Sequence, residues 1–117
     1  MVLYDGKHDV SKEEVFEKVR YYYKQATLAM EYWEKGNKKV AIDLARSLRN
    51  SLKAEYKNNH LVRIERLYGK DKHFINYTAA ITDAYVSIAG QITYRNVYSF
   101  LYDVCDYIRY YFSEIVS

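Results

Sequence analysis

The sequence predicts an all-α protein, and three features of its 117 residues indicate this class. The chain contains no proline, so long helices can form without interruption. Apolar residues recur at steps of three and four along several stretches, as they do on the buried side of a helix. Glycine and asparagine separate these stretches. We therefore expect an antiparallel up-and-down four-helix bundle, built as a single domain over residues 1–117.

The first predicted helix runs from about Lys12 to Glu34, after a loose arm over residues 1–10. The tetrapeptide SKEE at its start has the pattern of a capping box, in which Ser11 and Glu14 satisfy free backbone amides. Its apolar seam is expected to face the core. The seam residues are Phe16, Val19, Tyr23, Ala26, Met30 and Trp33.

A short joint that contains Gly36 and Asn37 follows the first helix. Gly36 suits the left-handed position that ends a helix, and Asn37 suits the N-cap of the next one. Because the joint is so short, the first two helices are predicted to form an antiparallel hairpin.

The second predicted helix begins at Lys38 and has two opposed sides. Its apolar seam repeats every four residues, at Leu44, Leu48, Leu52 and Tyr56. Side chains two positions apart on a helix point about 200° away from each other, so a basic stripe lies almost opposite the seam. Asp43 and Glu55 are the acids available locally to balance it. The stripe consists of Lys38, Lys39, Arg46, Arg49, Lys53 and Lys57.

The regular pattern of this helix weakens at Asn58-Asn59 and resumes from Leu61 to Tyr68. One continuous rod to Tyr68 would overhang the first helix by about 12 Å at the usual rise per residue. We therefore favour a kink or a break at the two asparagines.

The third predicted helix runs from Lys72 to about Ala89, with Phe74, Thr78, Ile81, Tyr85 and Ile88 facing inward. The segment 84–97 also fits a β-hairpin that turns at Ala89-Gly90. We favour a helix end and a loop, because Gly90 suits a C-cap and Thr93 the next N-cap. The fourth helix then carries an apolar seam to the C-terminus: Val97, Leu101, Val104, Ile108, Phe112 and Ile115.

The charge of the chain is uneven. The net charge is +3, yet residues 38–72 contain ten Lys or Arg against four acids, which leaves −3 for the rest. This asymmetry favours an anionic partner for the middle segment. The basic stripe could contact phosphates of RNA or of single-stranded nucleic acid, although a solvated face has the same pattern.

The composition of the chain also limits which disulfides, membrane segments, metals and cofactors we expect. One cysteine, Cys105, allows no intramolecular disulfide and is expected to be buried. No apolar run has the length of a membrane span, and no signal peptide opens the chain, so we expect a cytoplasmic protein with no membrane contact. Three histidines on separate segments and four isolated glycines predict no metal and no cofactor. The high tyrosine, lysine and isoleucine content suggests a thermophilic, archaeal or viral source.

The chain contains fifteen tyrosines, more than the apolar seams of the four predicted helices can bury. Tyr98 and Tyr102 lie one turn apart, close to the row of Arg95 and Arg109. Rings beside guanidinium groups suit base stacking, and they suit protein contacts equally. We favour an interface, either of a homodimer or with a protein partner.

Arg66 and His73 are separated by six residues, across the joint between the second and third helices. A histidine can act as general base on a ribose 2′-hydroxyl while an arginine holds the phosphate. This spacing resembles the R-x(4–6)-H motif of the HEPN superfamily of small helical domains. The hairpin WEKGNKKVAIDLARSLRNSLKAEY is also similar to the first helices of that superfamily. Leu67 departs from it, because a polar residue usually follows the arginine there.

The resemblance implies an RNA-associated helical bundle, either cleaving RNA without metal or only binding it. We favour a non-enzymatic module that binds RNA or single-stranded nucleic acid, or a protein complex built on it. The alternative is a HEPN-like RNase that uses Arg66 and His73. A second alternative is a structural or viral assembly protein joined through tyrosine-rich interfaces.

Overall fold

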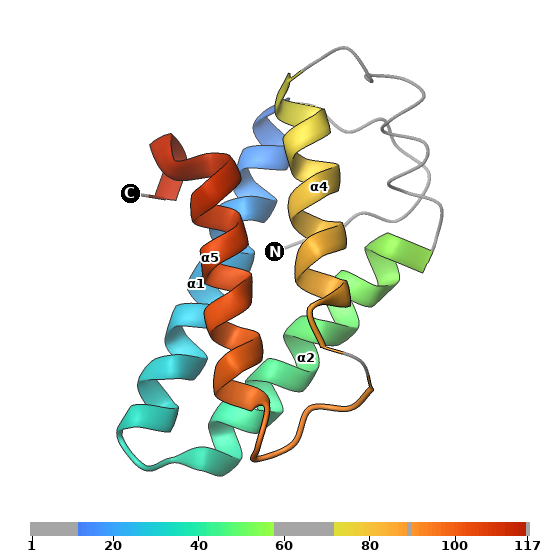
Figure 1. Ribbon diagram of the computed structural model, residues 1–117. Helices are drawn as coiled ribbons and strands as arrows, with labels where there is room; N and C mark the ends of the chain where they lie inside the picture. The colour runs from blue at the N-terminus through green and yellow to red at the C-terminus, as the bar shows by residue number, and fades with distance from the viewer. Residues whose placement is uncertain (1–11, 58–71, 89, 117) are drawn as a thin grey trace.

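The computed structural model of the chain describes residues 12–57, 72–88 and 90–116. Within these residues it contains four α-helices, which Figure 1 shows running alternately down and up along the molecule. They confirm the predicted all-α up-and-down four-helix arrangement. The helices are α1 (Lys12–Glu34), α2 (Lys38–Lys57), α4 (Lys72–Val86) and α5 (Val97–Val116).

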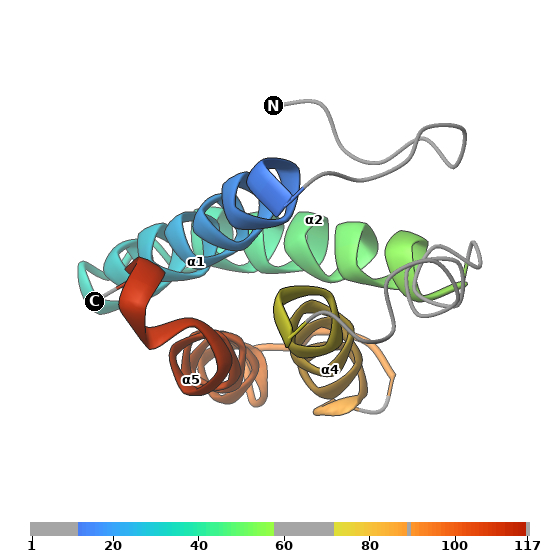
Figure 2. The same cartoon turned by 90° about the horizontal axis from the view of Figure 1, so that it is seen from above.

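The helices form two layers. Seen from above, α1 and α2 make one layer and α4 and α5 make the other (Figure 2). α1 packs mainly on α2 and α5, and α4 packs mainly on the same two helices. The core therefore lies between the layers and receives side chains from all four helices.

The joint between α1 and α2 has the predicted geometry. Gly36 has φ of +89°, in the left-handed region. Its amide donates to the carbonyl of Trp33 at 3.0 Å, and the amide of Asn37 donates to that of Tyr32 at 2.8 Å. These two bonds are the Schellman pattern, which satisfies carbonyls that the helix end leaves free. The carbonyl of Asn37 then accepts from Ala41 at 3.2 Å, as expected of an N-cap residue.

Replacing Gly36 by alanine is expected to lower the free energy of unfolding by about 1–2 kcal/mol, because the left-handed conformation strains any residue with a Cβ. A Cβ at this position would have no atom within 4 Å, so the cost is backbone strain without a steric clash. Urea denaturation of Gly36→Ala beside Gly36→Asn measures it, since asparagine tolerates this conformation better. Equal stability of the alanine variant and the parent protein would contradict the explanation.

The buried side of α1 is wider than its predicted seam. Val19 and Ala26 are buried as predicted, whereas Phe16, Tyr23, Met30 and Trp33 only pack partly buried against the core. The positions just before three of them are fully enclosed: Val15, Tyr22 and Ala29. α1 contacts both α2 and α5, so a single seam is too narrow to cover its contacts.

The prediction for α2 was wrong at its C-terminal end. Leu48 and Leu52 are buried as predicted, but Tyr56 is 41% exposed and Glu55 is buried in its place. A repeat of four residues turns by 400°, so each step drifts 40° around the helix. Five of the six enclosed positions instead alternate steps of four and three, which stay on one side: Ala41, Ala45, Leu48, Leu52 and Glu55. The sixth is Ile42, next to this row.

α4 ends at Val86, three residues before the predicted end at Ala89. Gly90 is left-handed, with φ of +90°, and no strand occurs in residues 84–88 or 90–97, so the described part of this segment is a helix end and a loop. The carbonyl of Thr93 accepts from the amide of Val97 at 3.0 Å and closes the turn before α5. The carbonyl of Asn96 accepts from the amide of Phe100 at 2.9 Å, so Asn96 and not the predicted Thr93 is the N-cap residue of α5. The side chain of Asn96 accepts from the Thr93 amide at 2.7 Å and closes the loop.

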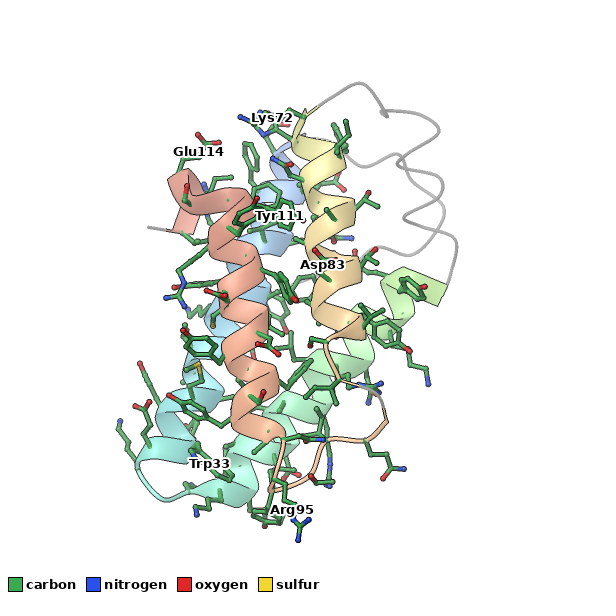
Figure 3. The ribbon with its side chains drawn as sticks, in the orientation of Figure 1. Trp33, Lys72, Asp83, Arg95, Tyr111 and Glu114 are labelled. Atoms are coloured by element: carbon green, nitrogen blue, oxygen red, sulfur yellow. The ribbon has the colours of Figure 1, made fainter. Side chains whose placement is uncertain are left out.

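α5 buries its predicted seam from Val97 to Phe112. It kinks at Phe112, where φ is −135° and ψ is 39°, and its last turn departs sideways in Figure 1. Beside the kink, the Asn76 side chain donates to the carbonyl of Tyr111 at 3.5 Å, and the Tyr111 hydroxyl donates to Asp83 at 3.0 Å. Figure 3 labels Tyr111 on α5 and Asp83 on the neighbouring α4. A side chain that bonds the helix backbone accounts for such a kink.

Several predictions fall on residues outside the described ranges. They are the N-terminal arm, the capping role of Ser11, the bend at Asn58-Asn59 and the helical stretch from Leu61 to Tyr68. Among the helices that are described, none is both long enough and apolar enough to cross a membrane.

Candidate nucleic-acid interface

The outward side of α2 carries the predicted cations, and we call it the basic face: Lys38, Lys39, Arg46, Arg49 and Lys53. Four of these side chains are exposed, and that of Arg49 is partly buried. The sixth predicted cation, Lys57, closes α2, and its side chain lies outside the described part.

Acids of α2 neutralise little of the basic face. Lys39 pairs with Asp43 at 2.9 Å between Nζ and Oδ2, and both groups are well exposed, so the pair contributes little. Glu55 was expected to balance the face, but its side chain points into the core. Five cations therefore stand against one exposed carboxylate within residues 38–56.

The loop before α5 lies against the basic face. The Arg46 guanidinium donates from one terminal nitrogen to the carbonyl of Ile92 at 3.1 Å. Ile92 itself is buried, so the loop is anchored at this point. A guanidinium has five N–H donors, so this bond orients Arg46 and leaves most of its donors for another partner.

One aromatic group adjoins the C-terminal half of the basic face, and we call it the α4 platform: Arg49, Tyr56 and Tyr85. The guanidinium of Arg49 lies over the ring of Tyr85, 5.2 Å from its centroid. The ring of Tyr56 packs on the same tyrosine, with centroids 4.9 Å apart and an interplanar angle of 35°. Arg49 and Tyr56 thus share one tyrosine, which holds both in place.

A second aromatic group adjoins the N-terminal end of the basic face, and we call it the loop platform: Trp33, Lys38 and Tyr94. Lys38 Nζ lies 4.8 Å from the centroid of the Trp33 ring. The ring of Tyr94 lies 6.3 Å from that of Trp33, and Tyr94 is 61% exposed. In Figure 3 the neighbouring Arg95 lies at the same end of the molecule as Trp33.

The predicted interface residues divide between two places. Tyr98, Tyr102 and Arg109 are exposed on α5, and the guanidinium of Arg109 lies 5.9 Å from the ring centroid of Tyr23 in α1. Arg95 instead lies in the turn before α5. A role for these residues at a protein interface stays a prediction.

A charged cluster lies on the inner side of α2. Lys18 and Glu55 are 2% and 3% exposed, and Lys18 Nζ lies 3.3 Å from Glu55 Oε1. The hydroxyl of Tyr22 donates to the other carboxylate oxygen, and the hydroxyl of Tyr77 donates to Oε1. Burial, followed by the nearby charge of Glu55, raises the pKa of both tyrosines far above the usual value.

This cluster was missed from the sequence, although two residues signal it. Lys18 falls on the buried side of α1 between Val15 and Tyr22, and Glu55 follows Leu52 by three residues on the buried side of α2. Opposite charges on the inner sides of two paired helices predict a buried ion pair. The cluster joins α1, α2 and α4 in the core.

Of the predicted catalytic pair, only His73 lies within the described residues. Its ring meets that of Phe16 edge to face, with centroids 5.0 Å apart and planes at 87°. Arg66 lies outside the described ranges, so the pairing of Arg66 with His73 stays a prediction.

Cys105 is buried as predicted, and burial raises the pKa of its thiol to about 11. Its sulfur lies 4.0 Å from that of Met30 in α1. Across the described ranges, no group of three or more His, Cys, Asp or Glu side chains is placed to hold a metal ion.

Over its described residues, the protein is therefore an all-α arrangement of four helices with a cationic and aromatic surface along α2. No known protein family, curated protein or solved structure matches the chain. Its function is therefore inferred from its own residues.

Proposed function

We propose that the protein binds RNA or single-stranded nucleic acid along the basic face of α2. The observation that carries this proposal is the excess of cations on that face, since Glu55 is enclosed in the core and only Asp43 remains exposed within residues 38–56. A row of cations that outnumbers the exposed acids of the same helix suits the phosphates of a strand. The tyrosines beside it supply the apolar surface that unpaired bases require.

The geometry also supports binding without prior rearrangement. Arg46 is oriented by the Ile92 carbonyl, and Arg49 by the ring of Tyr85. Side chains that are already ordered lose less entropy when they bind. If about four phosphates are contacted, the logarithm of the association constant should fall with the logarithm of salt concentration at a slope of about −3.

The double charge reversal Arg46→Glu/Lys53→Glu is expected to weaken binding of a single-stranded RNA by about tenfold or more at low salt. It should also reduce the salt slope by about 1.4, because two phosphate contacts are lost. Fluorescence anisotropy of a labelled uridine oligomer, titrated at several salt concentrations, measures both quantities.

The matched control is Arg20→Glu/Lys24→Glu, which makes the same charge change at two exposed positions of α1. This control should retain most of the affinity and a slope closer to that of the parent protein. An equal loss in both double variants would show that net charge alone matters and would refute a binding face on α2.

The HEPN resemblance suggests RNA cleavage as an alternative function, which the samples from the binding titrations can also test. If the protein cleaves RNA without metal, denaturing gels will show shortened RNA after each titration. Arg66 and His73 are then the residues to replace, and cleavage that persists in His73→Ala would exclude the predicted pair.

A further inference from the structure

We propose that the α4 platform and the loop platform are stacking sites for unpaired nucleobases, so that the protein reads bases as well as phosphates. This inference rests on the proposed function and names the form of its substrate: a single strand lying along α2. Phosphate binding by the basic face gives no role to the aromatic residues beside it, whereas base stacking does.

The α4 platform has an outer ring that the core does not enclose. Tyr56 is 41% exposed, although it belongs to the same helix as the fully buried Leu52. Its ring packs against Tyr85, which in turn packs against Arg49. A ring that a neighbouring side chain holds in place, and that is still exposed to solvent, can stack on a nucleobase with little loss of entropy.

The loop platform repeats this arrangement at the other end of α2. Tyr94 is 61% exposed, packs against Trp33, and lies in a loop that Arg46 anchors through Ile92. Lys38 lies over the Trp33 ring and adds a positive charge beside it. Each platform therefore combines an exposed tyrosine, a second aromatic ring and a cation.

The cations between the platforms lie where a connecting backbone would pass. Arg46 and Lys53 are exposed on the turns of α2 that separate Lys38 from Tyr56. A strand whose bases occupy both platforms would carry its phosphates past these two side chains.

The spacing of the platforms sets the length of the strand. From Lys38 to Tyr56 the helix rises by about 27 Å. This distance corresponds to about eight nucleotides at the 3.4 Å spacing of one stacked strand. In a duplex the faces of the bases are covered by their neighbours, so a duplex could engage the cations but neither platform.

The test compares a ten-nucleotide uridine RNA with an abasic oligomer of ten phosphates, which carries similar charge and no bases. The parent protein should bind the uridine oligomer at least about tenfold more tightly. Trp33 is the only tryptophan of the chain, so quenching of its fluorescence reports contact at the loop platform directly.

The variant Tyr56→Ala/Tyr94→Ala should lose the preference for the uridine oligomer but keep its affinity for the abasic one. Tyr56→Phe/Tyr94→Phe should retain the preference, because stacking needs the ring and not the hydroxyl. Tyr110→Ala removes a tyrosine that is 79% exposed on α5 and serves as the control.

Equal affinity of the parent protein for the two oligomers would overturn the stacking sites and leave polyanion binding standing. Equal affinity for a ten-base-pair duplex would overturn them too. If neither oligomer binds, the proposed function fails together with this inference.

Discussion

Replacing Glu55 by alanine is expected to lower the free energy of unfolding by about 3–5 kcal/mol, because it removes one partner of a buried ion pair. The change would leave the Lys18 ammonium without this carboxylate and would deprive the hydroxyls of Tyr22 and Tyr77 of their common acceptor. Each of these groups has been taken out of water and cannot recover its hydration in the core. Urea denaturation followed by circular dichroism measures the loss.

Two variants give this prediction its controls. Glu31→Ala removes an exposed acid of α1 and should change stability by no more than about 0.5 kcal/mol. Glu55→Gln keeps an acceptor for the tyrosines but loses the charge that offsets Lys18. Its decrease in the free energy of unfolding should therefore lie between those of Glu31→Ala and Glu55→Ala. A cost for Glu55→Ala as small as that for Glu31→Ala would contradict the enclosed position of the carboxylate.

The folded protein is expected to lose stability steeply as the pH rises above about 10, because Tyr22 and Tyr77 can release their protons only after unfolding. Their folded pKa is raised, chiefly by burial, so above pH 10 the unfolded chain binds fewer protons than the folded chain. The derivative of the unfolding free energy with pH is then negative. At 1.36 kcal/mol per proton and pH unit, the two tyrosines together approach a slope of about −2.7 kcal/mol per pH unit.

Other groups also titrate in this range, so the comparison between variants isolates the effect. Tyr22→Phe should remove about half of the slope assigned to the pair, measured by urea denaturation between pH 9 and pH 11.5. Tyr110→Phe, in which the replaced ring is 79% exposed, is the matched control. The buried position of Tyr22 would be refuted if the two phenylalanine variants had the same slope.

The buried cluster also bears on the candidate interface. Because Glu55 is bonded on the inner side of α2, the neighbouring positions of Lys53 and Tyr56 are turned toward solvent. The rotation of α2 about its axis therefore decides both what enters the core and which side chains can meet a nucleic acid.

Local sequence alone was enough to predict several elements. The bounds of α1 and the Gly36-Asn37 joint follow from apolar spacing and from capping residues, which act over a few positions and need no partner helix. The seam of α5 was predicted up to Phe112, because a long regular pattern specifies one buried side. Of the cations predicted to lie on the outer side of α2, Lys38, Lys39, Arg46 and Lys53 are exposed, whereas Arg49 is partly buried.

Only the tertiary structure decided how these elements meet. Whether Glu55 or Tyr56 enters the core depends on Lys18 of α1 and Tyr77 of α4, which lie far away in the sequence. Tyr85 and Tyr94 reach the basic face because α4 and the loop before α5 pack beside α2. Apolar spacing in one helix cannot reveal such contacts, since burial of a charge or exposure of a ring is settled by the partner helices.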